Sequence, residues 1–222
     1  MNLIAQYLIT VPAVLLAIIL HELAHGYTAD RLGDPTPRAM GRLTLNPLKH
    51  LDPIGALCMV FFHFGWARPV PINSRYFKNK KRDIALTALA GPLTNLLLAF
   101  LSFPIYALLW KGYVKAAFSG SNAEFLIAFT LMLAYFFYYF HIVNIGLCLF
   151  NLIPIPPLDG SRILFALLPP KYYFSIMRYE RYFSLLLLLV IFGGVRLGLL
   201  SGLSEAISGL MESVWSLLPI FR

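Results

Sequence analysis

Residues 3–25 read LIAQYLITVPAVLLAIILHELAH, and they carry the strongest signal in the chain. No side chain between Leu3 and Leu20 is charged, so the run is apolar and long enough to enter a bilayer as a helix. It ends in the motif HELAH at residues 21–25. Residues four apart on a helix lie about 40° apart around its axis, so both imidazoles can reach one zinc ion. The stretch therefore predicts a zinc site inside a membrane, with Glu22 beside it to handle a proton of water.

The composition of the chain indicates an integral membrane protein. Of its 222 residues, 59% are hydrophobic and 13% are charged, and the mean hydropathy is +0.73. A soluble domain has about 45–50% apolar and about 25% charged residues. The net charge of +8 is explained by basic loops facing anionic lipid, so we expect no nucleic-acid partner. Cys58 and Cys148 lie in apolar segments and give no sign of a disulfide framework.

The apolar segments predict an all-α polytopic membrane protein with about five to six transmembrane or re-entrant helices. The first segment has no basic stretch before it and no small-residue cleavage site, so it is interpreted as a retained span. The remaining expected helices are spans at 84–110 and 124–150, a re-entrant or tilted segment at 51–66, a short helix at 160–168, and apolar runs at 185–200 and 203–218 that turn at Ser201-Gly202. We expect one membrane-embedded domain over 1–222, with a catalytic core over about 3–168 and a C-terminal helical pair over about 183–220.

Between the first two spans, the sequence predicts a small membrane-associated β element at Arg42–Leu45 and Arg68–Asn73. The second stretch alternates with prolines, which an edge strand tolerates and a central strand does not. A polar loop is expected at 111–122. The basic loops at 31–50, 66–83 and 171–182 predict a shared cytoplasmic side. The active site is then expected toward the cytoplasmic side of the plasma membrane.

A catalytic zinc ion needs a third protein ligand in addition to His21 and His25. Asp159 is the best candidate, because prolines unwind the chain before it and Gly160 permits close approach. The alternative is that Asp159 only caps the helix that starts at Gly160. Asp30 and Asp34 are nearer in sequence but lie in or beside a polar loop, so they are poorer candidates.

Polar residues recur at helical spacing in the two later spans. In the first, Asn95 belongs to a stripe of mostly small residues, and its amide could bind a peptide carbonyl or join helices. In the second, a stripe contains His141 and Asn144 and ends at Asn151, near the proposed metal. An ionisable residue inside a span is a candidate functional residue, and interhelical hydrogen bonding is the alternative. His50 is expected to face the membrane interface.

These motifs resemble the site-2 protease family, which are intramembrane zinc metalloproteases. The resemblance rests on HELAH at 21–25, GPLTN at 91–95 and FNLIPIPPLDG at 150–160, and it covers roughly residues 10–165. No insertion is long enough for a PDZ domain or a CBS pair, so a short prokaryotic-type form is expected.

The resemblance implies a role for each site residue. His21, His25 and Asp159 would bind one zinc ion per chain, and Glu22 would be the catalytic base. Asn95 and Asn151 would bind substrate or stabilise an oxyanion. The polar stripe, and not the resemblance, makes His141 and Asn144 candidates for residues that contact the metal ligands. The family cleaves transmembrane segments of other proteins, so transmembrane protein substrates in a lipid bilayer are the implied partners.

Two other functional classes fit the composition. A catalytically silent membrane-embedded binding protein would have no use for Glu22, which is intact. A metal or ion transporter usually shows internal repeats, and none is visible here. An intramembrane zinc endopeptidase is therefore the leading hypothesis.

Overall fold

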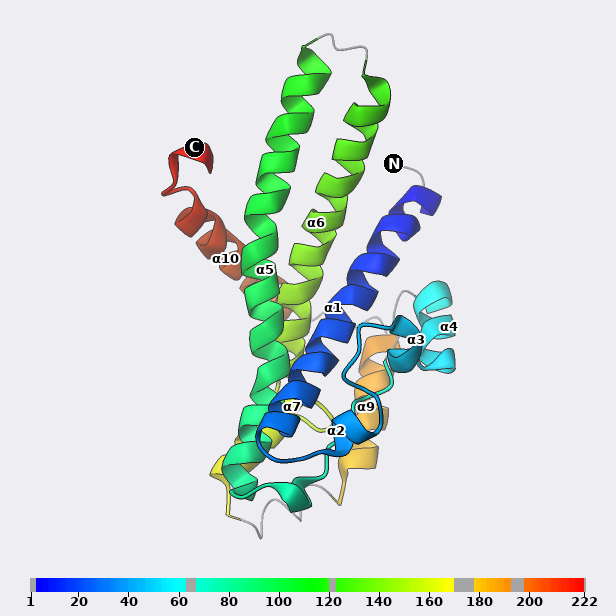
Figure 1. Cartoon of the computed structure of the whole chain (residues 1–222), viewed down its shortest axis with the longest axis vertical. Helices are drawn as coiled ribbons and strands as arrows, with labels where there is room; N and C mark the ends of the chain where they lie inside the picture. The colour runs from blue at the N-terminus through cyan, green and yellow to red at the C-terminus, as the bar shows by residue number, and fades with distance from the viewer. Residues whose placement is uncertain (1–2, 63–66, 120–122, 170–177, 193–197, 222) are drawn as a thin grey trace. The chain divides into compact units, whose positions relative to one another are not determined.

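The computed structural model describes residues 3–62, 67–119, 123–169, 178–192 and 198–221 (Figure 1). The chain divides into two compact units, each of which is described by itself. Unit 1 comprises Met1–Ala17, Asn95–Leu147 and Leu199–Arg222. Unit 2 comprises Ile18–Thr94 and Cys148–Gly198.

Three long helices dominate the chain: α1 (Leu3–Arg31), α5 (Lys80–Phe118) and α6 (Glu124–Asn151). In the part that the structure describes, these three are long and apolar enough to cross a membrane. The shorter helices are α2 (Thr36–Ala39), α3 (Pro47–His50), α4 (Pro53–Phe62), α7 (Asp159–Leu167), α9 (Glu180–Phe192) and α10 (Gly198–Trp215), with single 3₁₀ turns at Ser74–Tyr76 and Pro219–Phe221.

The predicted all-α class agrees with the structure, but the count of five to six spans is not confirmed. The helices α4 and α9 have 10 and 13 residues, fewer than the roughly 20 that a straight span needs. The 18 residues of α10 include Glu205 and Glu212, and α10 is not among the candidate spans.

The predicted β element is not confirmed, since no strand occurs among the described residues and a single isolated bridge joins Leu51 to Ala67. The physical reason lies in the amides of the segment 68–73. Val70 N–H donates to the Glu22 carboxylate and Asn73 N–H to the Asp34 carboxylate, at 2.8 and 2.6 Å. Side chains on or just after α1 thus take the amides that a ladder would use, while prolines 69 and 71 have no N–H.

Two predicted loops are wrong. The loop expected at 111–122 starts later, because α5 continues to Phe118. With 39 residues, α5 is about 58 Å long, well beyond the roughly 30 Å of a hydrocarbon core. The turn expected at Ser201-Gly202 lies inside α10, since one glycine inside a helix costs only about 1 kcal/mol. The connection between α9 and α10, at 193–197, lies outside the described residues.

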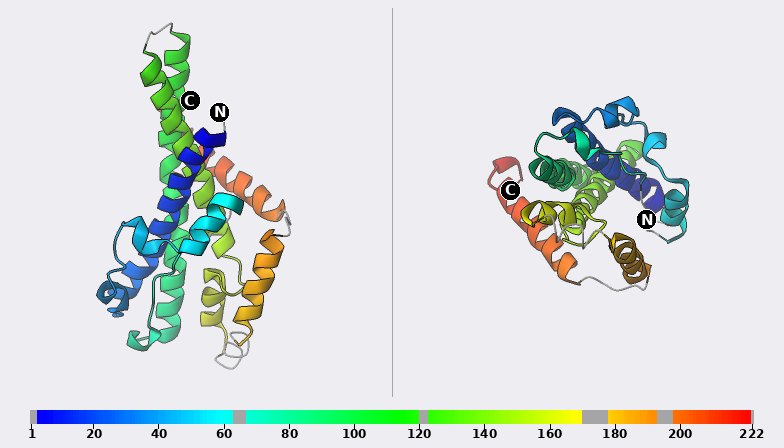
Figure 2. Two further views of the ribbon diagram at one scale, coloured as in Figure 1. Left: turned by 90° about the vertical axis from the view of Figure 1, so that its right-hand side faces the viewer. Right: turned by 90° about the horizontal axis from the view of Figure 1, so that it is seen from below.

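In unit 1, the C-terminal part of α5 and the N-terminal part of α6 lie side by side, as Figure 1 shows. Aromatic rings fill the contact: the centroids of Tyr106 and Tyr138 are 5.4 Å apart and those of Trp110 and Tyr135 are 6.5 Å apart. The helix α10 lies against this pair (Figure 2), where Trp215 Nε1–H donates to the Phe100 carbonyl at 3.0 Å. The rings of Phe100 and Trp215, with centroids 4.9 Å apart, and this part-buried indole hydrogen bond therefore hold α10 to the rest of unit 1.

In unit 2, the segment after α1 folds back onto that helix. Gly26 allows this approach, because a Cβ there would lie 2.8 Å from Leu43 Cδ2 and 3.2 Å from Val70 Cγ1. The fully buried Asp34 fixes the turn by accepting from Thr36 N–H at 3.0 Å as well as from Asn73 N–H. The two stretches that follow α1 and α4 are therefore tied to the end of α1.

Candidate metal centre

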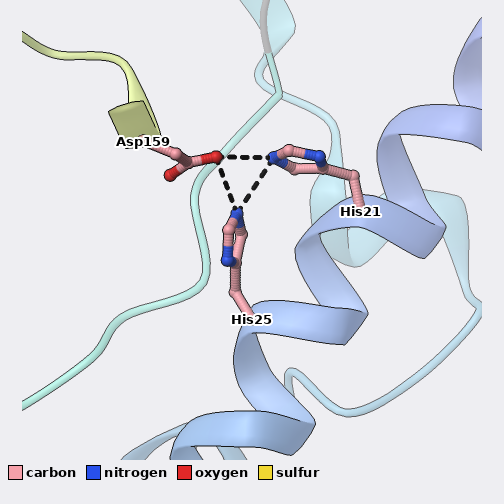
Figure 3. Close-up of side chains that lie close together, drawn as sticks. All are labelled: His21, His25 and Asp159. Atoms are coloured by element: carbon pink, nitrogen blue, oxygen red, sulfur yellow. Dashed lines mark hydrogen bonds and ion pairs between the residues drawn. The ribbon is translucent and has the colours of Figure 1, made fainter. Parts of the chain in front are cut away.

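The helix α1 presents His21 and His25 on one face, one turn apart. Both side chains are buried, and their Nε2 atoms are 2.9 Å from each other. The rings stand nearly perpendicular, with an angle of 87° between their planes. Figure 3 shows that both rings point toward the start of α7.

Asp159 completes the cluster from a distant part of the sequence. Its Oδ2 atom is 3.1 Å from His21 Nε2 and 3.1 Å from His25 Nε2 (Figure 3). Asp159 is the first residue of α7, after a broken stretch at 152–158. At the next position, a Cβ on Gly160 would collide with the carbonyl oxygens of Leu152 and Ile153. The tight fold of this stretch brings the carboxylate to the histidines.

The protonation of His25 suits a cation in the middle of the cluster. Its Nδ1 atom is 2.7 Å from the carbonyl oxygen of Thr87, and a carbonyl only accepts, so Nδ1–H is the donor. In the neutral ring Nε2 then carries a lone pair that faces the other two ligand atoms. A second hydrogen bond of this kind orients most metal-binding histidines.

The spacing of the cluster also fits a small metal ion. Two ligand atoms of a tetrahedral zinc site, each about 2.0–2.1 Å from the ion, lie about 3.3 Å apart. The three separations here are 2.9, 3.1 and 3.1 Å. Within the described residues, these three side chains form the group of His, Cys, Asp or Glu that could hold a metal ion. The donor set of two imidazoles and one carboxylate therefore fits zinc.

The state of Asp159 is consistent with a ligand. Burial alone would raise the pKa of its carboxyl, but the closeness of the His21 and His25 rings lowers that pKa below its ordinary value. The side chain is therefore ionised at neutral pH. Its Oδ2 atom faces the two histidines, so the geometry goes beyond the helix cap considered as the alternative.

Glu22 lies between the two histidines in sequence and is half-buried. Its Oε2 atom accepts a hydrogen bond from Val70 N–H at 2.8 Å. A buried cation, Arg42, is close enough for its charge to be attracted by Glu22. Burial lowers the pKa of the Arg42 guanidinium, and the Glu22 charge opposes that shift. The carboxylate is thus held by one backbone amide and interacts electrostatically with the Arg42 guanidinium.

Three further predicted residues, Asn95, Asn144 and His141, belong to unit 1. Asn95 is fully buried and donates to Asn144 Oδ1 at 2.7 Å. His141 Nδ1–H donates to the Ala99 carbonyl and Ser208 donates to His141 Nε2, each at 2.9 Å. These are the interhelical bonds that the alternative reading predicts. A role for the three residues at the metal centre stays a prediction.

The remaining carboxylates and the last asparagine are placed as follows. Asp30 is ion-paired with Arg38 at 2.6 Å, and Asp34 holds backbone amides, so neither belongs to the cluster. Asn151 is the half-buried last residue of α6, at the start of the broken stretch. Its role in substrate binding stays a prediction. His50, expected at the membrane interface, is instead buried, with 1% of its surface exposed.

Sequence reasoning missed the residues that support the cluster. Gly91 is in contact with both histidines: a Cβ there would lie 2.5 Å from His21 Cε1 and 2.5 Å from His25 Nε2. Thr87 holds the ring of His25 from the same face of α5. Both belong, at intervals of four residues, to the stripe of mostly small residues that contains Asn95. The stripe indicated the close approach of another group but not that the group is the pair of histidines. The contact between Val70 and Glu22 had no signal in the sequence.

Comparison with known proteins agrees with this site. The model of peptidase family M50 matches residues 9–192. "Putative zinc metalloprotease YwhC" of Bacillus subtilis is 42% identical over 178 residues, which cover 80% of this chain and 77% of that protein.

More distant relatives are longer. "Putative zinc metalloprotease Rip2" of Mycobacterium tuberculosis is 31% identical over 192 residues, covering 80% of this chain and 64% of that protein. Rip2 of Mycolicibacterium smegmatis is 29% identical over 174 residues, covering 76% and 60%. No solved structure matches the chain significantly. The family match spans most of the chain, and the resemblance inferred from the motifs is confirmed: the chain belongs to peptidase family M50, the site-2 protease family, and is a metalloprotease.

Proposed function

We propose that this chain is an intramembrane zinc metalloprotease that hydrolyses peptide bonds within or near transmembrane segments of other membrane proteins. One observation carries the proposal: His21, His25 and Asp159 converge at the end of an apolar helix that is long enough to cross a bilayer. The names of the relatives YwhC and Rip2 as zinc metalloproteases support the choice of metal.

In this proposal the two Nε2 atoms and Asp159 Oδ2 hold one zinc ion. A bound zinc ion would supply Lewis acidity, which polarises a peptide carbonyl and makes a water molecule more acidic. Thr87 fixes the ring of His25, and Gly91 leaves room for both rings. His21, His25 and Asp159 would thus hold the zinc ion and leave it able to polarise a bound water molecule or a substrate carbonyl.

Glu22 serves as the general base. Its carboxylate takes the proton of the attacking water and later delivers it to the leaving nitrogen of the cleaved bond. The hydrogen bond from Val70 N–H holds one oxygen of the carboxylate, so its orientation is set before substrate arrives. A carboxylate at this point of a long apolar helix is costly without such a task.

The proposal includes an orientation and a substrate class. The basic loops after α1 and before α5 lie on the cytoplasmic side, which places the site toward the cytoplasmic face of the plasma membrane. Substrates are membrane proteins with a span that can unwind, since a helix hides the peptide bond that must be cut. Asn95 and Asn151 are proposed to bind the substrate backbone.

The test uses the purified full-length protein loaded with zinc and a single-span membrane protein as substrate. We expect about one zinc ion per chain and cleavage within or near the span. Glu22→Gln should keep the zinc and lose at least about a hundredfold in rate. The exposed Glu205→Gln, on α10, is the matched control and should cleave like the unsubstituted protein. Full cleavage by the Glu22→Gln variant would overturn the proposal.

A further inference from the structure

Arg42 is a buried cation whose hydrogen-bond donors are not all satisfied. Its side chain is 7% exposed, and Nη2 donates to the Arg68 carbonyl at 2.5 Å. Among the described residues, its buried Nε–H has no hydrogen-bond partner. An unpaired donor on a buried charged group is costly, so packing alone does not explain an arginine at this position.

The partner of Arg42 leads directly to Glu22. The Arg68 carbonyl, which Arg42 holds, and the Val70 N–H, which holds Glu22, belong to consecutive peptide groups of the chain. Arg68 N–H is itself bound to the His50 carbonyl at 2.7 Å. Both backbone groups of Arg68 are therefore hydrogen-bonded, the N–H to His50 and the carbonyl to Arg42. The next N–H along the chain, that of Val70, binds Glu22, the proposed base.

The charge of Glu22 favours the Arg42 cation at this position, whereas the charge of Arg68 opposes it. The prolines at 69 and 71 leave Val70 as the one residue between Arg68 and Ile72 that has an amide hydrogen. No neighbouring amide can take over its bond to Glu22, so the placement of Val70 depends on what holds Arg68.

From these contacts we infer that Arg42 is a positioning residue for Glu22: it clamps the Arg68 carbonyl so that Val70 N–H orients the catalytic carboxylate. This inference rests on the proposed function for its effect on rate. The clamp itself is a property of the folded chain and is measurable without substrate.

The first experiment measures hydrogen exchange of the zinc-loaded full-length protein by mass spectrometry, on peptides that cover residues 67–73. Arg42→Gln removes the cation and shortens the side chain, so Val70 is expected to exchange at least about tenfold faster. Arg38→Gln is the matched control, because Arg38 is an exposed arginine of the same connecting stretch that pairs with Asp30. It should leave exchange at 67–73 unchanged.

The second experiment measures cleavage kinetics and zinc content of the same proteins. Arg42→Gln should keep about one zinc ion and an unchanged KM within about threefold, while kcat falls about 10- to 100-fold, because a misplaced catalytic group lowers the rate and not substrate binding. Arg42→Lys keeps a donor for Arg68 and should recover part of both the protection and kcat. In a Glu22→Asp background, Arg42→Gln should cost less than it does alone.

The outcomes separate the possibilities. Exchange and kcat of Arg42→Gln that match those of Arg38→Gln overturn the inference. If Arg42→Gln does not fold or loses zinc, Arg42→Lys decides: faster Val70 exchange with lower kcat supports the clamp, and values equal to the unsubstituted protein overturn it. An unsubstituted protein that cleaves nothing overturns the proposed function, whereas the exchange result still stands as a test of the clamp.

Discussion

At the scale of single residues, the position of the ring proton of His25 determines what the cluster of His21, His25 and Asp159 can bind. The Thr87 carbonyl holds the proton of His25 on Nδ1, at 2.7 Å, so the neutral ring turns its lone pair toward Asp159. A lone pair of His25 and a negative oxygen of Asp159 repel each other unless a positive charge, a metal ion or a proton on the ring, lies between them. The arrangement therefore suits a cation among the three ligand atoms.

The carboxylate of Asp159 should be indispensable for this binding. Asp159→Asn keeps the shape but removes the charge, so we expect the zinc content, measured by mass spectrometry of the purified protein, to fall below about a tenth of an ion per chain. Asp30→Asn removes a carboxylate near the end of α1 that pairs with Arg38 instead, and should leave zinc unchanged. A zinc-loaded Asp159→Asn protein would show that the ligand set is different.

The missing side chain at Gly91 should be equally important. Gly91→Ala places a methyl group 2.5 Å from both histidine rings, so we expect the rings to shift and cleavage to fall at least about a hundredfold. The matched control lies on the same helix: Gly112 has open space around it, and Gly112→Ala should keep activity and add up to about 1 kcal/mol of stability. Equal activity of the two variants would contradict the packing described for the site.

At the scale of elements, α5 and α6 are joined in unit 1 by polar contacts. Asn95 and Asn144, both fully buried, share a hydrogen bond of 2.7 Å, and Asn144 also donates to the Phe140 carbonyl at 2.7 Å. Such pairs contribute about 1 kcal/mol in membranes, and an orphaned partner costs more.

Asn144→Ala should therefore destabilise the protein through Asn95. We expect a loss of about 1–3 kcal/mol in the free energy of unfolding, measured by thermal or denaturant unfolding in detergent. The double variant Asn95→Ala with Asn144→Ala should lose less than the sum of the single variants. Additive losses would mean that the contact contributes little to stability.

Elements that depend on neighbouring residues in the sequence were predictable, and elements that depend on contacts with residues far along the chain were not. The first helix, expected to carry the apolar run from Leu3 to Leu20 and the motif at 21–25, spans Leu3–Arg31, because polar residues and a glycine turn follow the motif. The short helix expected at 160–168 spans Asp159–Leu167, and it ends just before Pro169, which disfavours helical backbone in the residue that precedes it. The β element at 42–45 and 68–73 failed, because amides there bind Glu22 and Asp34 from elsewhere in the chain.

The candidate site follows the same division. The motif at 21–25 is local and fixes two histidines and a glutamate by helical spacing. The contact with Asp159 spans 134 residues, and the broken stretch at 152–158 made it a candidate without showing where it points. The contact between Glu22 and Val70 spans 48 residues and depends on how a loop folds back. Patterns along the chain carry no information about such a contact.

At the scale of the whole molecule, the metal should couple activity to stability. A chelator that removes zinc should abolish cleavage, and one equivalent of zinc should restore it. Ligand binding to the folded state also stabilises it, by about 4 kcal/mol at a free concentration of 1,000 times Kd, so the midpoint of thermal unfolding should fall after chelation. Unchanged activity after complete zinc removal would contradict the proposed chemistry.

The orientation of the protein is testable in cells. Lys80 is exposed and lies at the start of α5, in a basic stretch expected on the cytoplasmic side. In a background without Cys58 and Cys148, Lys80→Cys should resist a thiol reagent that cannot cross the membrane until the cells are opened. Leu126→Cys, on the exposed N-terminal part of α6, is expected to react from outside. The opposite pattern would reverse the proposed topology.

The prolines on either side of Val70 also limit the backbone hydrogen bonds that this segment can form with other protein chains. An extended segment with unpaired amide hydrogens can pair with a strand of another chain, and natural sheets place proline at their edges to prevent this pairing. Between Arg68 and Ile72 a single amide hydrogen exists, and Glu22 already holds it. The stretch therefore offers no free amide hydrogen between Arg68 and Ile72 for pairing with a strand of another chain.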